Sequence, residues 1–375
     1  MKLYLVAGET SGDSRGAELM RALRERIPDA QILGAGGREM RQFGGDAIFD
    51  WADEAVVGLW DVLKKYGYFR KQFHRMLAEI AAAKPAALIT IDYPGFNMRL
   101  AKAAKKRFPN LRTIHYVSPQ VWAWHRGRIP KMAKFLDLML CLFPFELPLY
   151  ANAGLRAVCT GHPLLDSLAE KRRDQPRDPS LVALLPGSRG KEVRRIFPVM
   201  VDAAMRLREL NPSLRFEAAA VNDALAGEMR DILRARGQDE SLCPVTVRTA
   251  HDLMQRAGAG MVCSGTATLE SAFFGLPMVI LYKIGWLTHA VARQMVKIPC
   301  IGLPNVLAGR EIAREFIQSA AQPGPIASAI RELLENAAAR EAQQHALAAV
   351  IASLGDPGAA RRAAGAIANT LALEA

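Results

Sequence analysis

Residues 181–193, LVALLPGSRGKEV, decide the fold that this sequence predicts. The apolar run at 181–185 is typical of a parallel strand that is buried on both faces. PGSRG at 186–190 ends the strand in a tight turn, and the following KEV begins a helix. A strand, a glycine-rich turn and a helix N-terminus together form an anion site, because backbone N–H groups and the positive end of the helix dipole point outward there.

The helix dipole alone contributes about 0.3–1 kcal/mol, which is too little to hold a diphosphate. Arg189 in the turn adds charge-assisted hydrogen bonds worth roughly 1.5–3 kcal/mol. Gly187 and Ser188 complete this candidate site through their backbone N–H groups. The structural alternative is an ordinary strand–helix turn with a surface arginine, and this motif alone does not decide between the two.

The same alternation of apolar runs and helical patterns extends along the whole chain of 375 residues. It predicts parallel sheets covered by helices, with ligands beyond the carboxyl ends of the strands. A charged, proline-bearing segment, EKRRDQPRDP at 170–179, interrupts the pattern. We therefore predict an α/β fold with two tandem Rossmann-like domains, 1–169 and 170–345, and a cleft between them. A helical tail, 346–375, crosses back to the first domain or exchanges with a partner chain. The strands are expected at 2–7, 31–35, 86–91, 112–117, 136–142, 157–160, 181–185, 214–220, 245–248, 260–263 and 277–281.

The amino-acid composition indicates which kinds of partner and which cellular environment to expect for this protein. Lys and Arg exceed Asp and Glu by 49 to 37, a net charge of +12, which favours an anionic partner: a nucleotide, a phospholipid surface or a nucleic acid. Five cysteines are scattered through apolar runs, as expected of reduced core thiols. No uncharged apolar run approaches the ~20 residues of a spanning helix, so we expect a soluble protein or one bound to a membrane face. D-x-D and metal-ligand spacings are absent, so no metal and no cofactor is expected.

GETSGD at 8–13 follows the first predicted strand and precedes a helix. Its glycines, hydroxyls and carboxylate, among them Glu9, Ser11 and Gly12, suit a sugar or phosphate ligand. The structural alternative is that Ser11 or Asp13 simply caps the helix.

IDYPGFN at 91–97 places Asp92 at the end of a buried strand. A partly desolvated carboxylate there can accept a proton from an incoming hydroxyl. The alternative role for Asp92 is to cap a helix that begins near Asn97. His115 and His162 also lie near strand ends, where they would be structural or would face the cleft.

SGTATLE at 264–270 repeats this arrangement in the second half. Its backbone N–H groups and hydroxyls suit phosphate, and a carboxylate on the first helical turn can accept two hydrogen bonds from a ribose diol. Complementarity to the helix dipole and a capping box explain the same residues equally well. LPN at 303–305, with Arg310 and Glu311 behind it, is a weaker signal for a loop that closes over a donor. The candidate residues are Ser264, Gly265, Thr266, Thr268, Glu270 and Asn305.

Apolar residues recur at helical spacing between 62 and 80, flanked by basic ones. This pattern suits an anionic membrane surface, where each Lys or Arg contributes about 1 kcal/mol. It equally suits a helix that packs on the core with a solvated face. The apolar positions are Val62, Tyr66, Phe69, Phe73, Met76 and Ile80, and the basic ones are Lys64, Lys65, Arg70, Lys71 and Arg75.

Seven motifs, in order along nearly the whole chain, resemble lipid-A-disaccharide synthase. The resemblance implies an inverting, metal-independent glycosyltransferase of the two-Rossmann-domain B type. Such an enzyme transfers 2,3-diacylglucosamine from UDP to 2,3-diacylglucosamine 1-phosphate and forms a β-1,6 disaccharide at the cytoplasmic face of the Gram-negative inner membrane. By analogy the first domain takes the acceptor and the second takes the UDP donor, and a homodimer is left open. The motifs are VAGETSGD at 6–13, IDYPGFN at 91–97, HYVSPQVWAW at 115–124, GHPLLD at 161–166, LLPGSRGKEV at 184–193, SGTATLE at 264–270 and LPNVLAGRE at 303–311.

The resemblance also implies roles for single residues. The required carboxylate of the family matches Asp92 and its key arginine matches Arg189, while Glu9 and Asn305 match residues considered functional. Asp92 is then the base for the attacking hydroxyl, with Glu9 as the second candidate. Arg189 and nearby backbone N–H groups stabilise the departing UDP, and Glu270 holds the ribose. Asn97 and Ser118, which lie in matched motifs, complete the expected substrate-binding set.

Two rival functions are open. An isomerase like UDP-N-acetylglucosamine 2-epimerase would share the scaffold but release its product without an acceptor. A non-enzymatic, basic membrane-binding or nucleic-acid-binding protein would carry a recognition motif with clustered base-stacking aromatics, and the sequence shows none.

Overall fold

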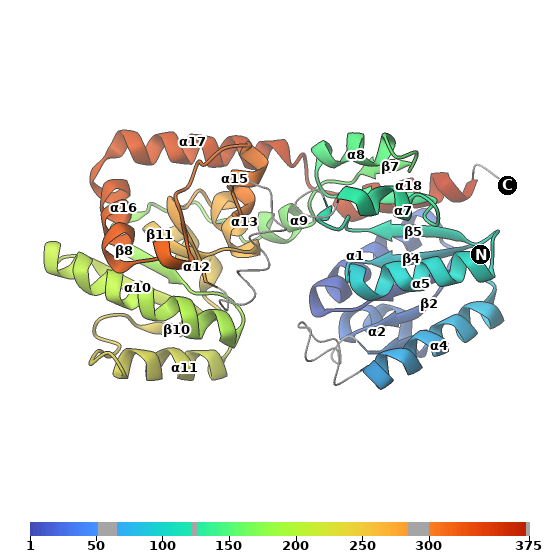
Figure 1. Ribbon diagram of the computed structural model, residues 1–375, viewed down its shortest axis with the longest axis horizontal. Coiled ribbons are helices and arrows are strands. Elements are labelled where there is room, and N and C mark those ends of the chain that lie inside the picture. The colour runs from blue at the N-terminus through green and yellow to red at the C-terminus, as the bar shows by residue number, and fades with distance from the viewer. Residues whose placement is uncertain (52–65, 122–125, 284–299, 373–375) are drawn as a thin grey trace. The chain divides into compact units, whose positions relative to one another are not determined.

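The computed structural model describes residues 1–51, 66–121, 126–283 and 300–372 (Figure 1). The chain forms two compact units, the first from Met1–Asp166 with Asp356–Ala375 and the second from Ser167–Gly355. The first boundary falls three residues before the expected one at 169/170. The chain returns to the first unit at Asp356, so the whole of helix α17 (Ala337–Ser353) belongs to the second unit, although its last part, from residue 346, was expected in the tail.

The first unit is a seven-stranded parallel sheet in the order β3-β2-β1-β4-β5-β6-β7. The order runs outward in both directions from the β1–β4 pair, as in a doubly wound fold. Its strands are β1 (Lys2–Ala7), β2 (Gln31–Gly36), β3 (Ile48–Asp50), β4 (Ala87–Ile91), β5 (Arg112–Tyr116), β6 (Leu138–Cys141) and β7 (Ala157–Cys159). Its main helices are α1 (Thr10–Arg26), α2 (Arg38–Gly44), α4 (Tyr66–Ala83), α5 (Pro94–Arg107), α7 (Ile129–Met132), α8 (Leu147–Ala151) and α18 (Ala359–Ala372); α9 (Leu164–Ala169) spans the boundary.

The second unit repeats this topology with six parallel strands in the order β10-β9-β8-β11-β12-β13. The expected fold class, two parallel-sheet α/β domains with a helical C-terminus, is therefore confirmed. The strands are β8 (Asp178–Leu185), β9 (Arg215–Ala220), β10 (Val245–Val247), β11 (Ala257–Cys263), β12 (Met278–Tyr282) and β13 (Glu315–Ile317). The helices are α10 (Gly190–Leu210), α11 (Asp223–Arg234), α12 (Ala250–Arg256), α13 (Thr266–Phe273), α15 (Leu303–Ala308), α16 (Pro323–Glu335) and α17.

Two outer strands, β3 and β13, are absent from the sequence-based expectation. Each has three residues, too few to show a period, and each pairs on one side only. Strand β8 also begins at Asp178, inside the segment that the sequence marks as a linker, because Asp178 pairs with Ala257 of β11.

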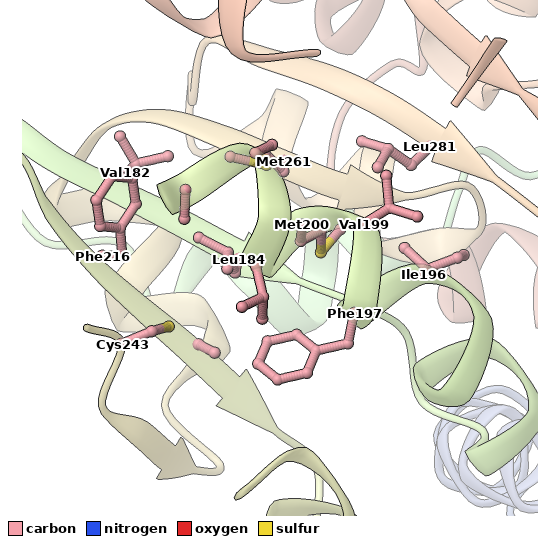
Figure 2. Close-up of a cluster of buried hydrophobic side chains, with 14 of the residues drawn as sticks. Val182, Leu184, Ile196, Phe197, Val199, Met200, Phe216, Cys243, Met261 and Leu281 are labelled. Carbon is pink, nitrogen blue, oxygen red and sulfur yellow. The ribbon is translucent and has the colours of Figure 1, made fainter. Parts of the chain in front are cut away.

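Strand β8, which contains the apolar run at 181–185, lies at the centre of the second unit's core (Figure 2). All five residues at 181–185 are less than 5% exposed, as predicted for a strand covered on both faces. On one face Val182 and Leu184 pack against Phe197 and Met200 of α10. The turn after β8 is therefore anchored at both ends by buried side chains.

The apolar stripe of α4 faces the core of the first unit. Phe69, Met76 and Ile80 are buried, and Phe73 packs partly buried against the same cluster. Phe69 and Phe73 are thus core residues, which favours the alternative of a helix that packs on the core. Gly67 lies in the first turn of the described helix. Val62, Lys64 and Lys65 lie outside the described residues, and none of the described helices combines the length and apolarity needed to cross a bilayer.

Candidate functional site

The predicted motifs meet in pairs at the strand pair where each sheet reverses its order. In the first unit Ala7 of β1 pairs with Ile91 of β4, so the motifs at 8–13 and 91–97 begin side by side. In the second unit β8 and β11 are neighbours, so the turn at 186–190 lies beside the motif at 264–270. Parallel strands end at the same edge, and open α/β sheets bind their ligands there.

Asp92 lies in a strained turn between β4 and α5. Its φ is +50° and that of Tyr93 is +46°, a left-handed pair of non-glycine residues that costs of order 1–3 kcal/mol each. The Asp92 N–H donates to the Tyr116 carbonyl at 2.9 Å, and Asn97 Nδ2 donates to the carbonyls of Ile91 (3.0 Å) and Asp92 (2.8 Å). These bonds fix the backbone that carries the carboxylate.

The side chain of Asp92 does not cap the helix, because α5 begins at Pro94 after an N-cap at Tyr93. Instead Oδ1 accepts the Tyr93 N–H at 2.9 Å and Oδ2 lies 2.6 Å from Arg15 Nη1. The side chain is 27% exposed, so a ligand can reach it. Arg15 is absent from the sequence prediction; its place one helical turn after Ser11 in α1 was the signal that could have found it.

The other residues of GETSGD divide between the site and the scaffold. Glu9 is the N-cap residue of α1, and its charge adds to burial in raising the pKa of Tyr93. Ser11 is exposed in the first turn of the helix. Gly12 is buried against the strand end, where an added Cβ would lie 3.8 Å from the Asp92 Cβ.

Asp13 is a structural residue of a kind that the sequence did not predict. It is 4% exposed, and its carboxylate accepts the N–H groups of Gly37 (2.7 Å), Glu39 (2.8 Å) and Met40 (3.0 Å) at the start of α2. It caps a neighbouring helix, not its own, because α2 begins beside the first turn of α1. A carboxylate is stabilising at a helix N-terminus.

Asp13→Asn is expected to lower the free energy of unfolding by about 1–3 kcal/mol, because the amide offers one acceptor oxygen where the carboxylate has two. Urea denaturation of the variant measures this loss. Asp29→Asn, at an exposed side chain, is the control and should change stability by less than about 0.5 kcal/mol. Equal losses in the two variants would contradict the capping role.

Asn97 and Ser118 are used within the first unit. Asn97 is fully buried, and its amide holds the Asp92 turn, so its place is behind the carboxylate. Ser118 is 6% exposed and donates to Glu146 Oε2 at 2.7 Å. Both side chains therefore serve the scaffold of the site more directly than a ligand.

His115 and His162 are buried. Thr90 Oγ1 lies 2.8 Å from His115 Nδ1, and the Leu164 N–H donates to His162 Nδ1 at 3.1 Å. Burial lowers the pKa of each to about 3, and the Arg15 charge contributes at His162. Both rings are neutral near pH 7, the structural alternative that the sequence left open.

These two histidines predict a pH dependence of stability. The folded-state pKa lies below the ordinary value of 6.5, so the unfolded chain takes up the protons first. Stability is complete above about pH 6.5 and falls by about 1.4 kcal/mol per pH unit per histidine as the pH drops toward 3. Denaturation curves across this range should show a shallower slope for His115→Gln than for the unmodified chain; an unchanged slope would contradict the assignment.

The turn after β8 holds a carboxylate where the sequence predicted a phosphate. Glu192 Oε2 accepts the N–H groups of Ser188 (3.1 Å) and Arg189 (3.2 Å), and Oε1 lies 3.3 Å from Arg189 Nη1. Gly187 has φ +115°, and a Cβ there would lie 2.5 Å from Glu192 Oε2, so only glycine permits this approach. Arg189 is 62% exposed. The N–H groups of Ser188 and Arg189 thus already have a partner within the chain, which the sequence did not predict.

The motif after β11 leaves its first residues accessible. Gly265 and Thr266 are exposed at the start of α13, and Ser264 is half-buried. Thr268 is fully buried, and its hydroxyl donates to the Gly265 carbonyl at 2.7 Å. Glu270 is half-buried with His251 Nε2 at 3.2 Å. Thr268 thus stabilises the turn, while Glu270 and the turn itself can reach a ligand.

A family model described as Lipid-A-disaccharide synthetase matches residues 3–369. The chain belongs to the lipid-A-disaccharide synthetase family. A lipid-A-disaccharide synthase of Trichlorobacter lovleyi is 40% identical over 374 residues, which cover 97% of this chain and 96% of the relative. The synthase of Pseudomonas aeruginosa strain UCBPP-PA14 is 38% identical over 346 residues, 90% of each chain.

Solved structures share the fold of this synthetase-family chain at low sequence identity. A ugt transferase from Siraitia grosvenorii in complex with UDP has a TM-score of 0.62 at 12% identity over 99% of both chains. CalG4, the calicheamicin glycosyltransferase, has a TM-score of 0.55 at 13% identity over 99% of this chain and 98% of its own. The UDP-GlcNAc 2-epimerase of Neisseria meningitidis, bound to UDP-GlcNAc, has 0.60 at 12% over 100% of both. The fold is thus the glycosyltransferase B type.

In this member of the synthetase family Asn305 is a scaffold residue. It is 1% exposed; its Oδ1 accepts the N–H groups of Ile312 and Ala313, and its Nδ2 donates to Glu315 Oε1 at 2.7 Å. These bonds tie α15 to the loop before β13. Arg310 in that loop is exposed. Across the described ranges, no three His, Cys, Asp or Glu side chains gather as metal ligands do.

Proposed function

We propose that this glycosyltransferase moves 2,3-diacylglucosamine from UDP to 2,3-diacylglucosamine 1-phosphate and forms the β-1,6-linked lipid A disaccharide 1-phosphate. Family membership supports the transfer and its product class. The observation that carries the mechanism is Asp92: an accessible carboxylate, fixed at both oxygens, at the strand end where an α/β sheet binds its ligand.

The reaction needs one base. Asp92 accepts the proton of the acceptor's 6-hydroxyl, and the oxygen attacks the donor's anomeric carbon from the side opposite UDP. The new C–O bond forms as the bond from that carbon to the β-phosphate oxygen breaks, and its electron pair leaves with UDP. Attack from the opposite side inverts the anomeric centre.

The second unit supplies the charge that UDP needs. Arg189 and the N–H groups of the turn after β8 receive the diphosphate, which takes the place that the Glu192 carboxylate holds. Fixed donors of this kind stabilise the charge that develops on the leaving group. Glu270 holds the ribose diol. The UDP complex of the Siraitia transferase, of the same fold, supports a UDP donor here.

The acyl chains of both substrates place the reaction at a membrane. We propose that the chain works at the anionic cytoplasmic face of the inner membrane, to which its net charge of +12 is complementary. By analogy with the family, the first unit binds the acceptor and the second unit binds the UDP donor.

The test is incubation of the full-length protein with UDP-2,3-diacylglucosamine and 2,3-diacylglucosamine 1-phosphate, followed by mass analysis. The expected product is the disaccharide 1-phosphate, with UDP released only when the acceptor is present. UDP released without the acceptor, or epimerised UDP-N-acetylglucosamine, would instead support the isomerase.

A further inference from the structure

Arg15 lies behind the proposed base. It projects from the second turn of α1, and its Nη1 is 2.6 Å from Asp92 Oδ2. The side chains of Arg15 and Asp92 are 20% and 27% exposed. A pair so withdrawn from water is screened less than a surface ion pair, so its geometry is held more strongly.

The ion pair completes the immobilisation of the carboxylate. The Tyr93 N–H occupies one position on Oδ1, and Arg15 occupies one on Oδ2. Each carboxylate oxygen accepts more than one hydrogen bond, so both retain a lone pair for an incoming hydroxyl. Arg15 therefore restrains the rotation of the side chain without closing the access to it.

Other ionisable groups surround Arg15. Glu18, one turn further along α1, is half-buried, and its pKa is raised by burial and by Asp166 of α9, against the opposing charges of Arg15 and Arg21. Burial, and secondarily the charge of Arg15, lowers the pKa of His162. Burial raises the pKa of Tyr116 in β5. The charges of four nearby residues also act on that pKa: Arg15, Glu18, Asp166 and, from α18, Arg362. Arg15 is the cation within this group that contacts Asp92.

We propose that Arg15 is a positioning residue for Asp92, which restrains the rotation of the carboxylate and aims its free lone pair at the acceptor hydroxyl. The inference rests on the proposed function, in which Asp92 is the base. The oxygen of a general base that accepts the proton must lie within hydrogen-bond reach of the reacting group. A misplacement of about 1 Å costs on the order of 10²-fold in rate.

The test compares Arg15→Met, Arg15→Lys and the control Arg26→Met, an exposed arginine in the last turn of the same helix. Rates of disaccharide formation are measured over a range of concentrations of each substrate. Arg15→Met should lower kcat about 10- to 100-fold and leave the KM for the 1-phosphate acceptor unchanged, because the carboxylate is then free to rotate away from the hydroxyl. Arg15→Lys should restore part of kcat, because its ammonium group can still bind Oδ2, and Arg26→Met should match the unmodified enzyme.

Three results overturn the inference. One is an unchanged kcat in a folded Arg15→Met, judged by its circular dichroism. The second is a rise in KM for the 1-phosphate acceptor at unchanged kcat, which would mean that Arg15 binds the acceptor phosphate. The third is a loss of kcat in Arg26→Met equal to that in Arg15→Met. If Arg15→Met does not fold, the kcat and the acceptor KM of Arg15→Gln decide the question. Failure of the proposed function is separate: full activity in Asp92→Asn removes the base itself.

Discussion

Asp92→Asn is expected to lower kcat by about 10²–10⁴-fold, the contribution of a general base, because the amide cannot accept the hydroxyl proton. UDP affinity should stay close to that of the unmodified enzyme, because the donor's phosphates bind on the second unit in the proposed mechanism. The Asn97 bonds to the backbone carbonyls of Ile91 and Asp92 are unaffected by this substitution, so the turn should keep its conformation. Steady-state rates and calorimetric titration with UDP measure the two quantities.

Glu9→Gln is the matched variant, since Glu9 follows β1, the strand that pairs with β4 ahead of Asp92. It should lose less activity than Asp92→Asn. A reversal of this order would assign the base to Glu9, and a parallel loss of UDP affinity and turnover in Asp92→Asn would remove Asp92 as a base altogether.

Arg189→Ala is expected to weaken UDP binding and turnover together, by about 10- to 100-fold each, which corresponds to the roughly 1.5–3 kcal/mol of a hydrogen bond to a charged group. The side chain is 62% exposed and available to a ligand. Its removal also leaves Glu192 without the cation that offsets its charge, so the diphosphate meets an unbalanced carboxylate. Titration with UDP and steady-state kinetics provide the two measurements.

Arg195→Ala, at another exposed arginine near the start of α10, is the control for a general loss of positive charge. It should leave UDP affinity within about twofold. Equal losses in the two variants would show that the overall field of the protein, and not a contact at the turn, accounts for donor affinity.

The strand ends of the candidate site could be read from the sequence, but the partners of the side chains could not. Asp92 directly follows one buried strand and Arg189 lies in the turn after another, and a buried parallel strand delivers the residues that follow it to the ligand edge of its sheet. Glu192 is near Arg189 in sequence, yet its bonds to two turn N–H groups depend on the left-handed Gly187. Asn305 lies in a sequence motif whether it binds a ligand or stabilises the fold. Only its burial and its hydrogen bond to Ile312 show that it ties α15 to a loop.

The sequence by itself determined the two parallel-sheet domains, their strand-end motifs and the family, because hydrophobic periodicity and ordered motifs are local and survive without knowledge of contacts. The tertiary structure alone decided that Asp13 caps α2, that the stripe of α4 faces the core, that α18 packs on α1, and that Arg15 holds Asp92. Each of these is a contact between segments distant in sequence, 77 residues apart for Arg15 and Asp92. Such contacts form only when strand order and helix packing bring the segments together. The spacing of residues along the chain specifies neither the strand order nor the helix packing.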